Sequence, residues 1–188
     1  MTEAGLEASK AKVRQAARAR RAAAFDPAAA QALVARFPES LRGVSPVAGY
    51  WPIGSEIDPR PLMAALAAGG AALALPRMAN RAGPAVFLRW RPDTALSADA
   101  FGALAPPPEA EAAAPRLLLV PLLAFDRSGR RLGQGGGHYD RILAALRPGV
   151  IAVGLAYAAQ VLPEVPAGPL DQRLDWIVTE REAVRATP

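Results

Sequence analysis

Two patterns of apolar positions alternate along this chain of 188 residues. Short, continuous apolar runs bounded by proline or glycine are typical of strands buried on both faces, whereas helical spacing and strong helix formers predict helices. Helices are predicted over residues 3–24, 26–36, 58–68 and 138–146. Strands are predicted over residues 44–51, 71–75, 84–90, 116–120, 150–155 and 174–179. The alternation predicts a three-layer α/β/α sandwich with a mainly parallel sheet, and such folds bind ligands beyond the carboxyl ends of the strands.

Local signals set the predicted boundaries. Asp26-Pro27 and Asp58-Pro59 each combine a helix N-cap with a first-turn proline, so each pair is expected to open a helix. Gly69-Gly70 ends the third helix, and Pro76 is expected to stop the strand that follows.

One domain over residues 1–188 is predicted. The proline-rich stretch 92–115 is interpreted as an ordered surface loop, because neither flank is large enough to stand alone. Asp126 and Gly129 suit a type I turn, which adds antiparallel character near residues 126–131. The basic helix 3–24 is expected to pack on the domain, and residues 181–188 are expected to form a tail.

Composition excludes several kinds of site. The chain has no cysteine, which excludes disulfides, thiolate metal sites and cysteine nucleophiles. With His138 as its single histidine, it cannot build a multi-histidine metal site. No apolar run reaches the length of about 18 residues that a transmembrane helix needs, and the N-terminus lacks a secretory signal. Residues 10–21 superficially resemble a mitochondrial transit peptide, but a cytoplasmic location without a membrane partner is the default expectation.

The net charge of +5 is mostly local. The excess lies in Lys10, Lys12, Arg14, Arg18, Arg20 and Arg21. Such a stripe is compatible with nucleic-acid binding, but the chain carries no recognisable motif for it, and no nucleic-acid partner is predicted. Two readings stay open: a solvated helix face, or a few basic residues that turn inward toward a phosphate.

Residues 131–140, RLGQGGGHYD, contain four glycines directly before a predicted helix. Glycine lets successive N–H groups converge on an anion, and the helix dipole adds positive potential at the same place. The segment matches neither the Walker loop nor the dinucleotide fingerprint. By pattern alone it is a candidate phosphate loop, with a glycine-rich packing turn as the alternative.

The wider sequence resembles the 5-formyltetrahydrofolate cyclo-ligase family, whose enzymes are also called 5,10-methenyltetrahydrofolate synthetases. The core of the resemblance is PLLAFD at 121–126, Gly129, and RLGQGGGHYDR at 131–141. Further matches are Lys10 with Arg14, WPIGSEI at 51–57, LPR at 75–77, GLAY at 154–157, Gln160, Asp171-x-x-x-Asp175 and Thr179-Glu180. The resemblance spans residues 10–180 and implies a fold similar to that of sugar-phosphate isomerases and CoA transferases.

The resemblance implies an ATP- and magnesium-dependent ligase of folate one-carbon metabolism. The formyl oxygen of 5-formyltetrahydrofolate would attack the γ-phosphate of ATP to give an imidoyl phosphate. The N10 nitrogen would then close the ring, releasing phosphate and leaving 5,10-methenyltetrahydrofolate and ADP. A monomer is expected. The rival readings are a different reaction on the same scaffold and a nucleic-acid-binding module built on the basic helix.

The resemblance also assigns roles to residues, although it names no catalytic side chain. The ATP positions are Lys10, Arg14, Arg131, Leu132, Gly133, Gln134, Gly135, Gly136, Gly137, His138 and Tyr139. The folate positions are Trp51, Glu56, Gln134, Gly135, Gly136, Gly137 and His138. The magnesium positions are Asp140 and Asp175.

Each single residue keeps a structural alternative. Arg131 would otherwise be a surface arginine that supports the turn, and Trp51 an ordinary core aromatic. Asp140 would be an acid at a helix N-terminus and Asp175 a residue at a strand end.

Two residues depart from the family pattern. His138 stands where the family usually has tyrosine, and Gln134 where tyrosine or arginine is common. Altered affinity is expected rather than lost activity, and His138 would add a pH dependence near neutrality if it contacts phosphate.

Overall fold

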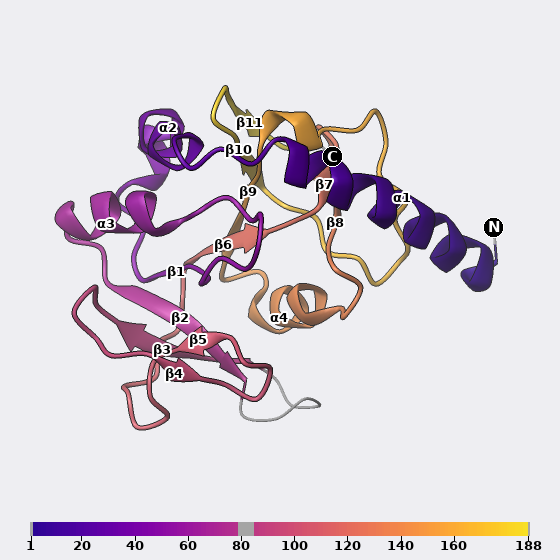
Figure 1. Ribbon diagram of the computed structural model, residues 1–188. Coiled ribbons are helices and arrows are strands. Elements are labelled where there is room, and N and C mark those ends of the chain that lie inside the picture. Colours follow the sequence, from indigo (N-terminus) through magenta and orange to yellow (C-terminus); the bar gives the residue numbers. More distant parts are fainter. Residues whose placement is uncertain (1, 79–84, 188) are drawn as a thin grey trace.

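A seven-stranded sheet forms the centre of the computed structural model, which describes residues 2–78 and 85–187 (Figure 1). The strand order is β11-β10-β9-β6-β1-β2-β3. The strands are β1 Val47–Ala48, β2 Leu73–Met78, β3 Ala85–Trp90, β6 Leu117–Pro121, β9 Ile151–Leu155, β10 Trp176–Val178 and β11 Ala183–Arg185. Strands β10, β9, β6, β1 and β2 pair in parallel, whereas β11 and β3 join the two edges antiparallel. The predicted mainly parallel sheet is confirmed.

Helices cover both faces of this sheet. The faces are covered by α2 Ala29–Arg36, α3 Arg60–Ala68 and α4 His138–Leu146. The chain also forms α1 Glu3–Ala23 and the short 3-10 turns η1 Glu39–Leu41 and η2 Ala158–Gln160. In β6, Leu117 and Leu119 belong to the core that contains α2 and α3, whereas Leu118 and Val120 belong to the core that contains α4. Figure 1 shows α2 and α3 on one side of the sheet and α4 on the other. The predicted three-layer α/β/α sandwich is therefore confirmed.

Both Asp-Pro signals lie near the starts of helices, but the N-caps are Ala28 and Pro59, and α2 and α3 each start later than predicted. The Oδ1 atom of Asp58 accepts a hydrogen bond from the N–H of Arg60 at 2.9 Å, and Asp26 accepts one from Ala28 at the same distance. The second helix was predicted from residue 26, but residues 27 and 28 form a turn and the helix begins at Ala29.

Strand β2 continues through Pro76, where the sequence predicted its end. The pairing of β2 with β1 ends at Ala74, while its pairing with β3 continues to Met78. Beyond Ala74, β2 is therefore paired on one side, with β3. Proline has no N–H to donate, so it is tolerated where its N–H position would face the unpaired side of a strand.

The C-terminal segment adds a strand, β11, that was not predicted from the sequence. Residues 181–188 were expected to be a tail, but β11 pairs antiparallel with β10, with Ile177 opposite Val184. Thr179 closes the connecting turn, because its backbone N–H donates to the carbonyl of Glu182 at 2.8 Å.

Two small hairpins lie outside the main sheet. Strands β4 Ser97–Ala98 and β5 Leu104–Ala105 pair antiparallel inside the stretch predicted as a loop. Strands β7 Ala124–Phe125 and β8 Arg131–Leu132 pair across the Asp126–Gly129 turn, which confirms the antiparallel character predicted there. Pro84, the predicted start of a strand, lies outside the described residues.

Helix α1 runs across the carboxyl end of the central strands. Its Ala17 packs with Leu123, Leu132 and Val165 in a third, smaller core cluster. This contact places the basic helix beside the segment that follows β6. Within residues 2–78 and 85–187, no helix is long and apolar enough to cross a membrane.

Candidate active site

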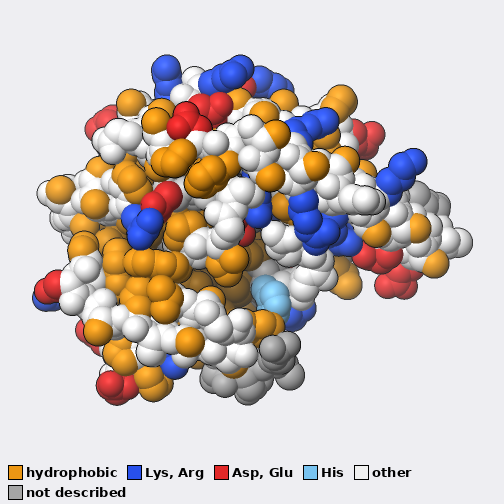
Figure 2. Space-filling view, viewed as in Figure 1, with side chains coloured by type: hydrophobic (Ala, Val, Ile, Leu, Met, Phe, Trp, Pro, Cys, Tyr) orange, Lys and Arg blue, Asp and Glu red, His pale blue; other side chains and the backbone are white. Residues whose placement is uncertain are grey.

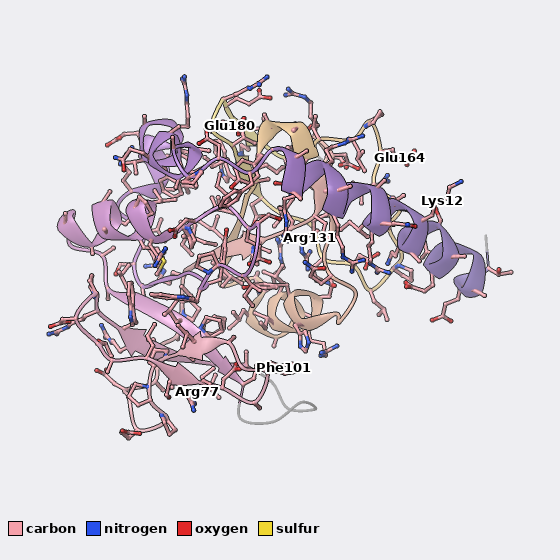
Figure 3. All side chains as sticks on the ribbon, in the orientation of Figure 1. Lys12, Arg77, Phe101, Arg131, Glu164 and Glu180 are labelled. Atoms are coloured by element: carbon pink, nitrogen blue, oxygen red, sulfur yellow. The ribbon has the colours of Figure 1, made fainter. Side chains whose placement is uncertain are left out.

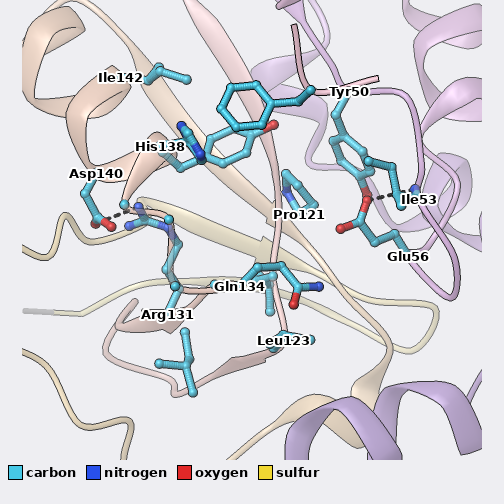
Figure 4. Close-up of a pocket in the computed structure, with 18 of the residues that line it drawn as sticks. Tyr50, Ile53, Glu56, Pro121, Leu123, Arg131, Gln134, His138, Asp140 and Ile142 are labelled. Carbon is cyan, nitrogen blue, oxygen red and sulfur yellow. Dashed lines mark hydrogen bonds and ion pairs between the residues drawn. The ribbon is translucent and has the colours of Figure 1, made fainter. Parts of the chain in front are cut away.

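A cavity of about 490 Å³ opens at the carboxyl end of β6. Its walls come from α1, the segment 50–56, the β4–β5 hairpin, residues 121–123, the glycine-rich segment with the first turn of α4, and Asp171. In Figure 2 a hollow lined by hydrophobic side chains opens beside the pale-blue His138. Figure 4 shows Arg131 and Asp140 at one end of this cavity and Glu56 with Ile53 at the other. The cavity therefore has two chemically different ends.

The glycine-rich segment forms one wall and leads into α4. Gly135 and Gly137 have φ values of 107° and 63°, which side chains rarely adopt, and Gly137 is the N-cap of the helix. A Cβ atom on Gly136 would lie 2.7 Å from the ring of His138. In the described part of the chain, no group accepts a hydrogen bond from the N–H groups of these three glycines. These donors stand at a helix N-terminus beside the cavity, an arrangement suited to an anion.

Two basic side chains of α1 reach the same end. Lys10 is 7% exposed, and its Nζ atom lies 2.6 Å from Oδ2 of Asp171. Arg14 donates from Nε to the carbonyl of Gly133 at 3.3 Å. Both side chains line the cavity. For Lys10 and Arg14, this placement favours the inward-turning reading of the basic stripe over the solvated helix face.

Arg131 is a buried cation at this end of the cavity. It is 8% exposed, donates from Nη2 to Oδ1 of Asp140 at 2.8 Å, and also donates to the carbonyl of Gln172. Burial lowers the pKa of Arg131, and the charge of Asp140 opposes that shift. A surface role for Arg131 is therefore wrong, since the side chain is enclosed and faces the cavity.

The two predicted magnesium positions are not brought together. Asp140 lines the cavity, but Asp175 does not. Asp175 precedes β10, at the amino end of the parallel strands. There its Oδ2 accepts from the N–H of Ala152 at 2.7 Å and from Arg147 at 3.1 Å. These contacts match the structural alternative for Asp175, a residue at a strand end.

Asp171 is the carboxylate that accompanies Asp140 in the cavity. It lines the wall, pairs with Lys10, and its charge raises the pKa of Arg131. Oδ1 of Asp140 also accepts from the backbone N–H of Gln172, the next residue, at 2.9 Å. In the sequence, Asp171 stands out only as the first acid of Asp171-x-x-x-Asp175. Among the described residues no cluster of three metal-binding side chains exists, so protein ligands alone form no complete metal site.

Glu56 supplies an acceptor at the opposite end. Its Oε2 accepts from the N–H of Ile53 at 3.0 Å, and its Oε1 lies 3.5 Å from Nη1 of Arg21. Burial raises the pKa of Glu56, while the N–H of Ile53 and the charge of Arg21 oppose the shift. The carboxylate is largely desolvated, since its side chain is 11% exposed.

Aromatic side chains surround this end. Trp51 lines the cavity and meets Trp90 edge to face, with ring centroids 6.2 Å apart. The guanidinium of Arg60 lies 4.8 Å from the ring centroid of Trp51. Phe101 from the β4–β5 hairpin lines the wall as well, but Trp90 does not.

His138 stands at the first position of α4. Its ring packs edge to face against Phe101, with centroids 4.9 Å apart, and Nδ1 lies 3.1 Å from Nη2 of Arg141. Burial and then the charge of Arg141 lower the pKa of His138 below its usual 6.5. The imidazole is therefore mainly neutral at pH 7.

The 5-formyltetrahydrofolate cyclo-ligase family model matches residues 6–180. The chain belongs to this family. A cyclo-ligase of Mycolicibacterium smegmatis is 40% identical over 155 residues, covering 74% of this chain and 76% of that protein. One from Escherichia coli K12 is 32% identical over 139 residues, covering 71% and 76%.

Solved structures agree with this assignment. The 5,10-methenyltetrahydrofolate synthetase of Aquifex aeolicus, determined by NMR, is 28% identical and superimposes with a TM-score of 0.80. The alignment covers 95% of this chain and 93% of that one. The Mycoplasma pneumoniae synthetase, at 22% identity and a TM-score of 0.70, shows the same fold.

In this member of the family, the cavity gathers nearly all the residues predicted from the family resemblance. Lys10, Arg14, Trp51, Glu56, the whole segment Arg131–Tyr139 and Asp140 line it. Asp175 is the exception. Tyr50, Asp99 and Leu104 were missed because their positions depend on how distant segments fold together. Arg21 carried a usable signal, since it lies seven residues after Arg14, on the same helix face.

Proposed function

We propose that this protein cyclises 5-formyltetrahydrofolate to 5,10-methenyltetrahydrofolate with conversion of ATP to ADP and phosphate. The observation that carries the proposal is a single cavity with glycine N–H groups and buried cations at one end and a buried carboxylate among aromatic rings at the other. An anion-binding end and a pterin-binding end within one cavity bring the phosphoryl donor and its acceptor together.

The phosphate end is assigned to ATP. Lys10, Arg14 and Arg131 would offset the charge of the phosphates, and a guanidinium offers paired donors to phosphate oxygens. The N–H groups of Gly135–Gly137 would add neutral donors at the start of α4.

Mg²⁺ fits the same end through Asp140 and Asp171. Magnesium prefers one or two carboxylates, with phosphate oxygens and water completing its coordination. Among the described residues, hydrogen bonds to Asp140 engage Oδ1 and leave Oδ2 available. Bound there, the ion would neutralise charge on the transferred phosphoryl group. Asp171 replaces Asp175 as the proposed second carboxylate, because Asp171 lies in the cavity wall.

The folate end is assigned to Glu56 and its aromatic neighbours. An ionised carboxylate can accept two hydrogen bonds from the amino-pyrimidine edge of a pterin. Trp51 and Phe101 provide flat apolar surface for the rest of the folate. Gln134 and His138 also line the cavity, and we assign them to the region where the formyl group would meet the phosphate.

The chemistry follows from this arrangement. The formyl oxygen attacks the γ-phosphorus, the bond to the β-phosphate oxygen breaks, and ADP leaves. The N10 nitrogen then attacks the formyl carbon and loses its proton as the carbon–oxygen bond breaks and phosphate departs. The protein contributes alignment and charge neutralisation, and we assign no covalent catalyst.

We further expect a single-domain monomer acting in the cytoplasm, without nucleic-acid or membrane partners. The inward placement of Lys10 and Arg21, which are 7% and 6% exposed, removes two cations from the outer basic stripe, on which Lys12, Arg18 and Arg20 remain exposed. Cations turned into a cavity are not available to the backbone of a duplex.

The decisive experiment incubates purified protein with 5-formyltetrahydrofolate, ATP and Mg²⁺ and records the absorbance of the methenyl product. ADP release should match product formation one to one, and omission of ATP or Mg²⁺ should stop both. A preparation that melts cooperatively yet yields no product and consumes no ATP would contradict the proposal.

A further inference from the structure

Helix α1 contributes side chains to both ends of the cavity. Lys10, Arg14, Ala17 and Arg21 follow one another at spacings of four, three and four residues, which places them on one helix face. The first two reach the phosphate end, whereas Arg21 lies beside Glu56. Figure 3 shows Lys12 on the outer side of the same helix, while Arg131 lies between α1 and α4. Arg21 is thus a cavity residue to which the family resemblance assigned no role.

Arg21 is held by two groups of the segment that carries Glu56. Its Nε donates to Oγ of Ser55 at 3.1 Å, and its Nη1 donates to Oε1 of Glu56 at 3.5 Å. The residue is 6% exposed. Because this buried guanidinium bonds to two consecutive residues, it fixes the position of the backbone at residues 55 and 56. It also places a positive charge beside Glu56.

The Glu56 carboxylate depends on such a neighbour. Its Oε2 is engaged by the N–H of Ile53, and Arg21 is the cation paired with its Oε1. Burial favours the protonated form of Glu56, and Arg21 favours the ionised form. The hydroxyls of Tyr50 and Tyr139 also lie within the field of Glu56, but burial raises the pKa of both, so they stay neutral. Arg21 is therefore the cation that, together with the N–H of Ile53, opposes the effect of burial on this carboxylate.

We propose that Arg21 is a positioning residue that holds the Glu56 carboxylate ionised and oriented to accept two hydrogen bonds from the pterin edge of the folate. The proposal rests on the function proposed above. Only an ionised carboxylate offers acceptors on both oxygens, because protonation converts one oxygen into a donor. Arg21 would then act on folate affinity through Glu56, without contact with the reacting atoms.

The alternative is direct contact between Arg21 and the substrate. A double-mutant cycle separates the two. If Arg21 acts through Glu56, replacing Arg21 should change folate affinity little once Glu56 has been replaced by a neutral residue. The variants are Arg21→Gln, Arg21→Lys, Glu56→Gln and the double variant Arg21→Gln/Glu56→Gln. Arg20→Gln is the matched control, since Arg20 is an exposed neighbour that donates to the carbonyl of Val161.

The first measurement is calorimetric binding of 5-formyltetrahydrofolate from pH 5 to 8, together with steady-state kinetics. Arg21→Gln should weaken folate binding about 10- to 100-fold, the range for a lost hydrogen bond to a charged group. The KM for ATP should stay within about twofold of the wild-type value. Arg21→Lys should recover part of the folate affinity because it keeps the charge, and Arg20→Gln should match the wild type.

The pH dependence gives the specific signature. Removing Arg21 takes away an influence that lowers the pKa of Glu56, so the acid limb of folate binding should move to higher pH in Arg21→Gln. A loss of affinity that is equal at every pH, or that persists undiminished in the Glu56→Gln background, would overturn the positioning role.

A second measurement needs no ligand. NMR titration of the Glu56 carboxyl carbon should show a higher pKa in Arg21→Gln than in the wild type, and an unchanged pKa would overturn the proposal. This readout also separates the two hypotheses. Wild-type protein that neither binds nor converts 5-formyltetrahydrofolate refutes the proposed function, whereas the titration still tests the link between Arg21 and Glu56.

Discussion

The ammonium of Lys10 lies 2.6 Å from the carboxylate of Asp171, although both residues line the end of the cavity proposed to hold phosphate. Oδ2 of Asp171 also accepts from the N–H of Gly168 at 2.6 Å, which fixes the carboxylate in the wall. Lys10 is almost fully buried, and a buried charge needs a partner. Asp171 thus pairs with the buried ammonium of Lys10 before a nucleotide arrives, and it brings a second acid close to the phosphate site.

Asp171→Asn should therefore weaken the response to Mg²⁺. Loss of one carboxylate is expected to raise the Mg²⁺ concentration for half-maximal activity at least about tenfold. Replacing even a residue that only supports a metal ligand typically lowers metal affinity by about that much. The measurement is product formation against free Mg²⁺ at saturating ATP.

Asp175→Asn is the matched comparison. Asp175 anchors the backbone of Ala152 and pairs with Arg147 outside the cavity, so its loss should cost about 1 kcal/mol of stability. For a domain of this size that corresponds to a drop in Tm of about 2–4 °C. If Asp175→Asn raises the Mg²⁺ requirement while Asp171→Asn does not, the assignment of the second carboxylate is reversed.

Glu56→Gln is expected to raise the thermal stability of the protein at pH 7 and to weaken folate binding. Because burial raises the pKa of Glu56 above its usual 4.5, the folded state binds this proton more tightly than the unfolded chain does. The stabilisation that comes from protonated Glu56 is therefore fully present below the pKa of this group in the unfolded chain. It is lost as the pH rises through the pKa of Glu56 in the folded protein. The neutral variant should therefore melt at a higher temperature than the wild type at pH 7 and bind folate much more weakly.

Thermal melts of both proteins from pH 4 to 8 test the stability part. The difference in Tm should shrink as the pH falls toward 4, where the wild-type carboxyl is protonated as well. A wild type that is more stable than Glu56→Gln at pH 7 would show that Arg21 more than offsets the burial of this carboxylate.

The sheet and the loop were predictable because their signals are local. Apolar runs such as residues 116–120 mark strands buried on both faces, and the glycines of 133–137 mark a loop that needs positive φ. The continuation of β2 through Pro76 was not predictable in this way, since it depends on where the neighbouring strand β1 ends. The same holds for β11, whose pairing with β10 needs a turn at Thr179 that no glycine or proline announces.

The sequence motifs that line the cavity could be predicted, but the contacts between their side chains could not. Lys10 and Glu56 were found from the family resemblance, whereas the contacts Lys10–Asp171 and Arg21–Glu56 join segments 161 and 35 residues apart in the sequence. Spacing along the chain does not report such contacts. Asp175 also belongs to a motif, but the motif does not show that this residue lies at the amino end of β10, outside the cavity.

Gly137→Ala should impair nucleotide binding and stability together. Gly137 is the N-cap of α4 at φ 63°, and this conformation costs a residue with a Cβ atom about 1–2 kcal/mol. A Cβ atom there would also lie 2.9 Å from the guanidinium of Arg141. The expected result is a drop in Tm of several degrees, roughly 2–4 °C per kcal/mol, and a raised KM for ATP.

Gly43→Ala is the control for this change. Gly43 lies outside the cavity, and a Cβ atom there would meet nothing within 4 Å. It should keep the wild-type KM and change the Tm little. An unchanged KM for ATP in Gly137→Ala would argue against the glycine-rich segment as the phosphate loop and favour the packing alternative.

His138→Tyr should remove an acid-side pH dependence. Burial and Arg141 lower the pKa of His138 below 6.5, so the imidazole is neutral at pH 7 and gains its charge only on further acidification. A positive charge at the start of α4 would strengthen binding of phosphate, and the KM of the wild type for ATP should therefore fall as the pH drops from about 6.5 to 5. Tyrosine has no charge to gain in that range, so the KM of the variant should not show this fall. Initial rates measured against ATP at saturating 5-formyltetrahydrofolate across this range decide the matter, and superimposable pH profiles would mean that His138 does not sense the nucleotide.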